Sequence, residues 1–86
     1  MSGSVRDRVV DYIVEDFLFG DRGRLPGDDE GLMARGILDS TGVLELIEFI
    51  EGEFDVRVDD EETTPDNLGS ISGIVRFVSD KLNAVV

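Results

Sequence analysis

The sequence has no cysteine, no histidine and no tryptophan, and it has only two prolines among its 86 residues. Without cysteine the chain can form neither disulfides nor zinc–thiolate sites, and it has no thiolate nucleophile. Without histidine it lacks the commonest general base and the commonest metal ligand. An independent enzyme is therefore the least expected class of function, because no nucleophile is paired with a base.

Positive charge is also scarce, with 8 basic residues against 20 acidic ones and a formal net charge of -12. Nucleic acid and anionic membranes are disfavoured as ligands, because both are bound through clustered Lys and Arg. A basic protein partner is the natural complement. No apolar run approaches the ~20 residues that span a bilayer, and no signal peptide opens the chain. We expect a cytoplasmic monomer with one small domain, residues 1–86.

Apolar residues recur at helical spacing in three stretches, which predicts an all-α fold. The expected helices cover residues 4–18, about 40–53, 65–68, and from Ser70 or Ser72 to about 83. Ser4 is suited to cap the first helix, and Gly20 is a stop signal after it. Pro65 suits the first position of the short helix. The pattern predicts a small four-helix bundle with three main helices, one short helix and a long first loop.

The long first loop, residues 20–39, is rich in glycine and polar turn formers. A loop of this length needs local packing or a function. The apolar residues expected to pack it across the helices, with a helical turn near Leu32, are Leu25, Leu32, Met33, Ile37 and Leu38. Residues 56–58 are expected to be an extended link. Tyr12 and the phenylalanines are expected in the core.

The most informative segment is Gly-Ile-Leu-Asp-Ser-Thr-Gly at residues 36–42, directly before an acidic helix. Ser40 lies where the loop meets the helix start, so a phosphate on it would be favoured by the helix dipole and the free amides. Nothing in the chain activates it as a nucleophile, so we expect it to be modified by another enzyme. The alternative is that Asp39 and Ser40 merely cap the helix.

The helix after Ser40 carries Glu45, Glu48 and Glu51 at intervals of three residues. Eleven acidic residues and one arginine lie between residues 38 and 66, which gives this segment a net charge of -10. Solvated glutamates are common on helices, but this concentration beside Ser40 favours a docking face for a basic partner.

These features together resemble the acyl carrier protein family. The resemblance rests on Asp39-Ser40 at the start of the second helix, Glu45-Leu46 one turn later, Glu53-Phe54 at its end, and the acidic stretch at residues 59–62. It implies a four-helix bundle in which a phosphopantetheinyl transferase attaches 4'-phosphopantetheine from coenzyme A to Ser40. Asp39 would cap the helix and contribute to transferase recognition. The arm would carry an acyl or aminoacyl group as a thioester between partner enzymes.

By the same resemblance, the second helix would be the docking surface for partner enzymes, with contacts at Glu45, Glu48, Glu51, Thr41 and Leu44. Its apolar side, Val43, Leu46 and Ile47, would be core and would also contact a sheltered cargo. Carriers of fatty acid synthesis usually have leucine after the serine, where this chain has Thr41 and Gly42. Their counterpart of residues 65–71 is shorter.

Residues 37–42 and 65–71 look more like discrete carriers that an adenylate-forming ligase loads with an amino acid or an unusual acyl group. A downstream transferase or synthase would then take the cargo.

Two other classes of function remain open. One is an acidic adaptor that binds a basic protein without a prosthetic group. The other is a calcium-binding helical domain, prompted by residues 59–62, although the spacing of a calcium loop is missing.

Overall fold

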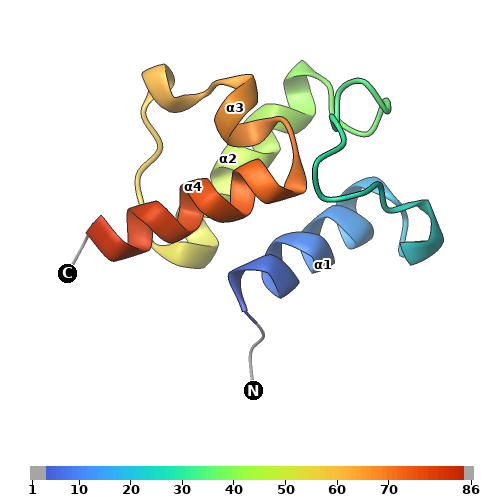
Figure 1. The fold of residues 1–86 in the computed structure, drawn as a ribbon, viewed down its shortest axis with the longest axis horizontal. Helices are drawn as coiled ribbons and strands as arrows, with labels where there is room; N and C mark the ends of the chain where they lie inside the picture. The colour runs from blue at the N-terminus through green and yellow to red at the C-terminus, as the bar shows by residue number, and fades with distance from the viewer. Residues whose placement is uncertain (1–3, 85–86) are drawn as a thin grey trace.

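The computed structural model describes residues 4–84, so the ends of the expected domain, residues 1–3 and 85–86, lie outside the described residues. Four α-helices and two short 3-10 helices follow one another along this range (Figure 1). In order they are α1 (Val5–Phe17), η1 (Arg22–Arg24), α2 (Ser40–Phe54), η2 (Asp60–Glu62), α3 (Pro65–Leu68) and α4 (Ile71–Ala84). The predicted all-α class and four-helix arrangement are confirmed.

Helix α1 begins where its capping residue predicts. The Ser4 hydroxyl accepts a hydrogen bond from the Asp7 amide, and the Asp7 carboxylate accepts one from the Ser4 amide. Such a capping box satisfies two amides that a helix start otherwise leaves without partners. At the other end, Phe19 and Gly20 both adopt positive φ and turn the chain into the loop.

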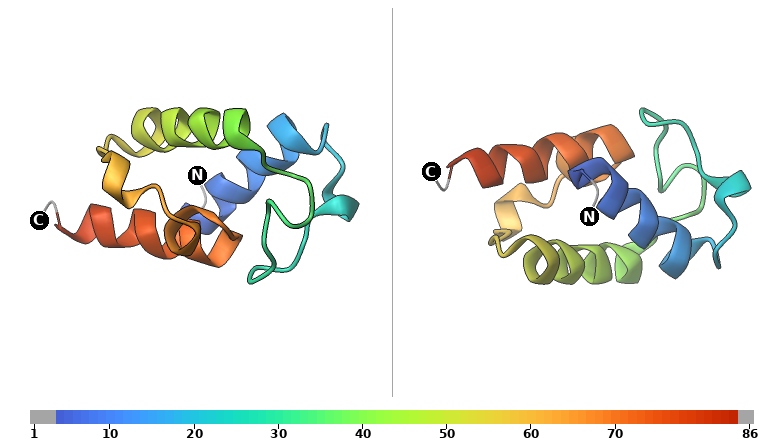
Figure 2. Two further views of the ribbon diagram at one scale, coloured as in Figure 1. Left: turned by 90° about the horizontal axis from the view of Figure 1, so that it is seen from above. Right: turned by 90° about the horizontal axis from the view of Figure 1, so that it is seen from below.

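The core lies where α1, α2 and α4 meet, with α3 and the first loop closing its sides (Figures 1 and 2). Buried apolar side chains come from every one of these segments. They are Val9, Val10, Ile13, Val14, Leu18, Leu32, Leu38, Leu46, Ile50, Phe54, Leu68, Ile71, Ile74, Phe77 and Val78. Burial of this apolar surface is the main force that holds the helices together.

The aromatic residues are less uniformly buried than the sequence predicts. Tyr12 stacks face to face on Phe49 with ring centroids 4.0 Å apart, and this half-buried pair joins α1 to α2. Phe54 and Phe77 are buried, but the side chain of Phe19 is 87% exposed. The expectation that every phenylalanine belongs to the core is wrong at Phe19, which follows the C-cap of α1 where positive φ angles turn the chain into the exposed loop.

The first loop packs largely as expected. Leu32 and Leu38 are buried, Leu25 and Ile37 are half-buried, and the turn near Leu32 is present as a hydrogen bond from the Arg35 amide to the Gly31 carbonyl. Met33 departs from the expectation, because its side chain is 55% exposed.

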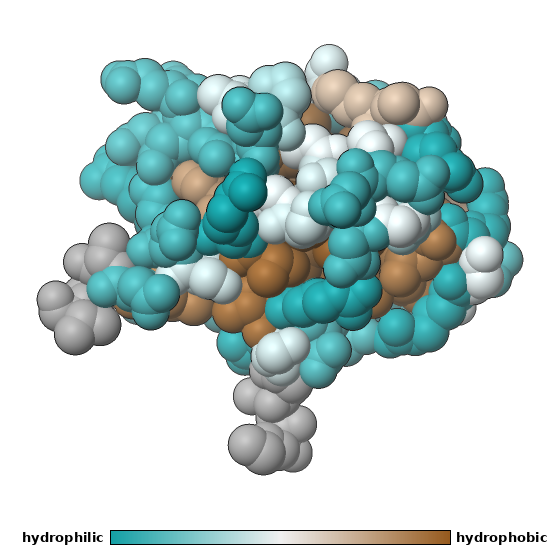
Figure 3. Space-filling view, viewed as in Figure 1, coloured by the Kyte–Doolittle hydropathy of each residue, from teal (hydrophilic) through white to brown (hydrophobic). Residues whose placement is uncertain are grey.

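Figure 3 shows a largely hydrophilic face with an apolar band where α1 meets α4. No helix within residues 4–84 is both long and apolar enough to cross a bilayer.

Candidate functional site

The start of α2 is fixed by the side chain of Asp39. Asp39 has an extended backbone, and its carboxylate accepts a hydrogen bond of 2.7 Å from the Gly42 amide. The carbonyl of Asp39 also accepts the first helical hydrogen bond, from the Val43 amide at 2.9 Å. Asp39 is therefore the N-cap, and Ser40 is the first residue inside the helix.

Ser40 is exposed, and its hydroxyl takes part in none of the hydrogen bonds formed among residues 4–84. The amides of a first helical turn have no partners within the helix, and the helix dipole adds partial positive charge there. This position favours an anion covalently attached to the Ser40 oxygen.

Gly42 allows the end of α1 to pack directly against the first turn of α2. A Cβ atom at position 42 would lie 3.0 Å from Phe17 Cε1 and 3.1 Å from Leu38 Cδ2. Those distances are shorter than ordinary carbon contacts, so only glycine fits this packing without displacing a neighbour.

A cavity of about 570 Å³ opens beside Ser40, between the first loop, the first turn of α2 and the region of α3. It is lined by Asp29, Gly31, Met33, Ala34, Ser40, Val43, Thr63, Thr64, Pro65, Leu68, Gly69 and Ser70. Of the three side chains expected to contact a cargo, Val43 lines this cavity. Leu46 is fully buried and Ile47 is half-buried, and neither is part of the lining.

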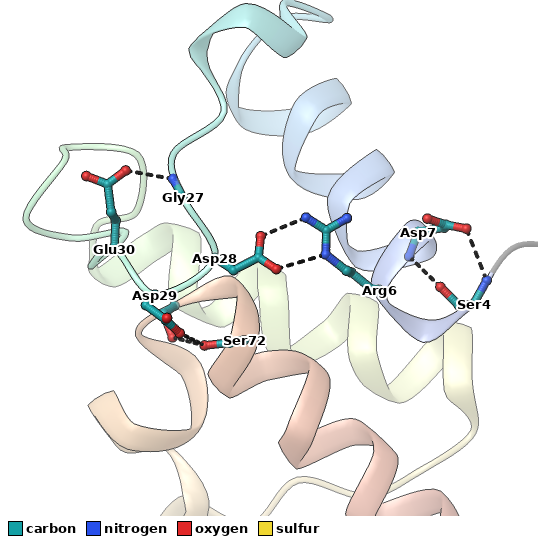
Figure 4. Close-up of polar contacts among 9 residues, drawn as sticks. Ser4, Arg6, Asp7, Gly27, Asp28, Asp29, Glu30 and Ser72 are labelled. Atoms are coloured by element: carbon teal, nitrogen blue, oxygen red, sulfur yellow. Dashed lines mark hydrogen bonds and ion pairs between the residues drawn. The ribbon is translucent and has the colours of Figure 1, made fainter.

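Backbone hydrogen bonds tie the loop wall of this cavity to the start of α4. The Leu32 amide donates to the Gly69 carbonyl at 2.8 Å, and the Ser72 amide donates to the Asp28 carbonyl at 2.9 Å. The Ser72 hydroxyl also donates to the Asp29 carboxylate at 2.7 Å (Figure 4). The wall facing Ser40 is thus held by contacts distant in sequence.

An ion pair anchors the same loop to α1. The Arg6 guanidinium makes two hydrogen bonds to the Asp28 carboxylate, at 2.7 and 3.0 Å (Figure 4). The hydrogen bond from Arg6 lowers the pKa of Asp28, and the same contact raises the pKa of Arg6. Both side chains remain partly exposed, so the pair acts as a geometric tether more than as a source of stability.

The acidic side chains predicted to contact partners have different surroundings. Glu45 and Glu48 are exposed on α2, as are Thr41 and the side chain of Leu44, which is 62% exposed. Glu51 is half-buried, and its carboxylate accepts a hydrogen bond from the backbone that follows α2. Glu45 and Glu48 take part in none of the hydrogen bonds or ion pairs formed among residues 4–84, so their carboxylates are exposed on α2 without such partners there.

A second, smaller hollow of about 260 Å³ lies on the α1 side of Ser40. It is lined by Asp16, Phe17, Gly36, Ile37, Asp39, Thr41, Gly42 and Glu45. Met33 in the cavity beside Ser40 and Asp16 in the smaller hollow were not expected there, because both come from segments that only the tertiary fold brings to the start of α2. The exposed position of an apolar residue such as Met33 has no signal in the sequence.

Residues 59–62 show no ligand set for a cation. The Glu62 carboxylate is bound by Lys81 at 2.6 Å and by the Asp59 amide at 3.0 Å, and the Lys81 contact lowers the pKa of Glu62. Across residues 4–84 no group of three or more acidic side chains is arranged to hold a metal ion. The calcium-binding alternative finds no geometric support in this part of the chain.

Comparison with known proteins adds to the geometry. No family model matches the sequence. Over 56 residues the chain is 41% identical to the D-alanyl carrier proteins of Streptococcus sanguinis, Streptococcus gordonii and Streptococcus thermophilus. The match covers 65% of this chain and 71% of each relative. With that identity and coverage, and an all-helical fold that places an exposed serine at the start of α2, the chain belongs to the acyl carrier protein family.

Proposed function

We propose that this carrier protein holds an acyl or aminoacyl group as a thioester on a 4'-phosphopantetheine arm attached to Ser40. The observation that carries the proposal is the position of Ser40. It is exposed at the first residue of α2, its hydroxyl is free of the hydrogen bonds among the described residues, and it borders a cavity of about 570 Å³.

The residues at the start of α2 fit a 4'-phosphopantetheine arm. Asp39 occupies the Gly42 amide and keeps the helix start in one geometry, and the dipole of α2 with the earlier amides of its first turn favours the phosphate of the arm. When attached, the arm supplies the thiol that the chain lacks. The Ser40 hydroxyl donates to no carboxylate among residues 4–84 and the sequence has no histidine, so the phosphopantetheinyl transferase would supply the base that accepts the Ser40 proton.

The cargo that fits best is an aminoacyl group or a small acyl group. The relatives are named as D-alanyl carrier proteins. The cavity beside Ser40 combines Met33, Val43 and Leu68 with the polar side chains of Thr63, Thr64, Ser70 and Asp29. The core behind it is closed, because Leu46 and Ile50 have no exposed surface. Because the core behind the cavity is closed, a short cargo matches this setting better than a long alkyl chain.

A carrier with a phosphopantetheine arm needs enzymes that attach the arm, load it and unload it. A phosphopantetheinyl transferase attaches the arm, an adenylate-forming ligase loads it, and a downstream transferase or synthase removes the cargo. Glu45 and Glu48 are exposed one and two turns after Ser40, so basic surfaces on these enzymes have charges to meet. Exposed Thr41 and Leu44 would contact the same partners, and a cytoplasmic monomer remains the expected state.

The test is intact-protein mass spectrometry after incubation with coenzyme A, Mg²⁺ and a broad-specificity phosphopantetheinyl transferase. The wild-type protein should gain one phosphopantetheine, and Ser40→Ala should gain none. Ser79→Ala provides a matched control, because it removes a serine hydroxyl from α4, away from the proposed partner contacts, and should gain the same single group as the wild type. No mass gain with several transferases would instead support the acidic adaptor, with Ser40 as part of a helix start only.

A further inference from the structure

Asp29 gives the cavity beside Ser40 an unbalanced negative charge. Of the residues in the described part of the chain that line this cavity, Asp29 is the one with a charged side chain, and none is basic. The other lining residues are apolar or carry neutral hydroxyls, such as Met33, Val43 and Thr63. A small group with a positive charge therefore finds its complement in this cavity, and an anion does not.

The sequence neighbours of Asp29 each hold an arginine, but Asp29 does not. Asp28 pairs with Arg6, and Glu30 pairs with Arg35 at 2.8 Å. None of the ion pairs found within residues 4–84 includes Asp29. Three consecutive carboxylates thus differ in their surroundings, and the middle one, which lines the cavity, has no cationic partner within the described residues.

One hydrogen bond fixes the position of the Asp29 carboxylate. The Ser72 hydroxyl donates to one carboxylate oxygen at 2.7 Å, as Figure 4 shows, and the second oxygen accepts no hydrogen bond within residues 4–84. The Ser72 amide donates to the Asp28 carbonyl at 2.9 Å, so the backbone beside Asp29 is held as well. An ionised carboxylate accepts several hydrogen bonds, and an ammonium group has three to donate. The carboxylate is thus positioned by the fold and still has an oxygen to offer a cation.

The negative charge of Asp29 is not needed to anchor the loop. An asparagine side chain would offer the Ser72 hydroxyl the same kind of oxygen acceptor. Asp29 is exposed, so solvent keeps its carboxylate ionised at little cost to the fold. What the charge adds, beyond the hydrogen bond, is affinity for a cation in the cavity.

An aminoacyl thioester carries a cation that would complete this site. Its α-ammonium group is mostly charged below about pH 7, whereas a simple acyl group has a neutral hydrogen or hydroxyl at the same position. Ser40, from which the arm would extend, lines the same cavity as Asp29. The apolar lining from Met33 and Val43 suits the methyl group of a small amino acid.

We propose that Asp29 binds the ammonium group of an aminoacyl cargo when the arm on Ser40 folds back over the cavity. The contact is non-covalent, so the thioester bond is unchanged and no proton moves. It makes Asp29 a specificity residue, because the carrier then shelters aminoacyl groups in preference to acyl groups that lack the charge. The inference rests on the proposed function, since both require the arm at Ser40.

The experiment compares D-alanyl cargo with D-lactyl cargo, in which a hydroxyl of similar size replaces the ammonium group. Each is joined through a stable amide to a coenzyme A analogue that has an amine in place of its thiol. A broad-specificity phosphopantetheinyl transferase then attaches the loaded arm to Ser40, and mass spectrometry confirms one arm per protein. The measurement, at about pH 6.5 and low salt, is the NMR shift of the Met33 and Val43 methyl signals relative to protein with the ordinary thiol arm.

In the wild type, the D-alanyl arm should shift both methyl signals about three times as far as the D-lactyl arm, since an exposed ion pair is a weak one. Asp29→Asn keeps an acceptor for Ser72 and should reduce the D-alanyl shift to the D-lactyl value. About 0.5 M NaCl should do the same in the wild type, because salt screens exposed charges. Asp66→Asn is the matched control and should change nothing, because Asp66 is exposed on α3 but is not part of the cavity lining.

Equal shifts for the two cargoes in the wild type would overturn the proposal, and this comparison needs no variant. A D-alanyl shift that persists in Asp29→Asn would also overturn it, because another group would then hold the ammonium. Both results leave the carrier function intact. A wild-type protein that never gains an arm would instead remove the proposed function, and the role of Asp29 with it.

Discussion

The carboxylate of Glu51 accepts a hydrogen bond of 2.9 Å from the backbone amide of Val58. This contact ties the last turn of α2 to the extended link that leads away from it. Of the three glutamates that recur along α2, Glu51 therefore has a role inside the fold, while Glu45 and Glu48 are exposed. The acidic row is not uniform, and its members should respond differently to substitution.

Glu51→Gln should lower the free energy of unfolding by about 1 kcal/mol, because a charged acceptor is replaced by a neutral one at a partly buried site. Glu48→Gln removes the same charge from an exposed position and should leave stability unchanged. Urea unfolding of both variants checks this.

The loading rate at low salt should fall in Glu48→Gln, and reversal to Glu48→Lys should also reduce the salt dependence of loading. Equal loading of Glu48→Lys and wild type at low salt would contradict the assignment of Glu48 to the docking face.

Asp39→Ala should destabilise the protein by about 1 kcal/mol, since the Gly42 amide loses its capping acceptor. Asp39→Asn retains an oxygen acceptor and should keep nearly full stability, but it removes the negative charge. If the transferase recognises the charge, phosphopantetheine transfer should slow in both variants. If Asp39→Asn is modified as fast as the wild type, the role of Asp39 is capping alone.

Gly52→Ala and Gly42→Ala should have opposite effects, although both glycines lie in α2. A Cβ at Gly52 meets no atom within 4 Å, so alanine should raise the free energy of unfolding by about 0.5 kcal/mol through helix propensity. At Gly42 the added carbon is crowded by Phe17 and Leu38, and the strain should exceed that gain by about 1 kcal/mol. Thermal and urea unfolding of the two variants measure the difference, and a stabilised Gly42→Ala would contradict the packing described here.

The phenol of Tyr12 should lose its proton at a higher pH than an exposed tyrosine does. Burial raises its pKa to about 12, with smaller contributions from the carboxylates of Asp16, Glu45 and Glu48. The unfolded chain releases the same proton near pH 10, so the folded state binds more protons between these values and stability falls as pH rises through the window. Tyr12 is the only tyrosine and there is no tryptophan, so absorbance at 295 nm follows this group alone. Tyr12→Phe should lose less stability than the wild type between pH 10 and 12, and identical losses would contradict the assignment.

The main helices and their starts could be predicted because their signals are local. Ser4 and Asp39 cap the next residues along the chain, and the apolar spacing of α1, α2 and α4 marks the buried faces. Helix α2 was expected at about 40–53 and covers Ser40–Phe54. Helix α4 was expected to begin near Ser70 or Ser72, and Ser70 caps it through a hydrogen bond from the Gly73 amide. Propensity, capping and periodicity agree at these places, which is why the sequence suffices.

The surroundings of Ser40 could be predicted only in part. The serine and its capping aspartate are adjacent in sequence, but Met33, Thr64 and Ser70 reach the cavity through long-range packing. The 3-10 helix Arg22–Arg24 was not expected, because Gly23 suggested an irregular loop. The internal hydrogen bond of Glu51 also depends on where residue 58 returns in the fold. Such contacts are set by tertiary structure, which a periodic pattern does not encode.

The hydrogen bond from Leu32 to Gly69 has a consequence for synthesis on the ribosome. It joins the loop before Ser40 to a residue near the start of α4, and the buried side chains Ile71, Ile74 and Val78 follow later still. Contacts this distant in sequence form only after both segments are available. A nascent chain that has exposed Ser40 but not yet α4 therefore lacks the wall facing the serine. The finished arrangement around Ser40 arises only once α4 is available to fold, so a modifying enzyme that reads this shape acts after that stage.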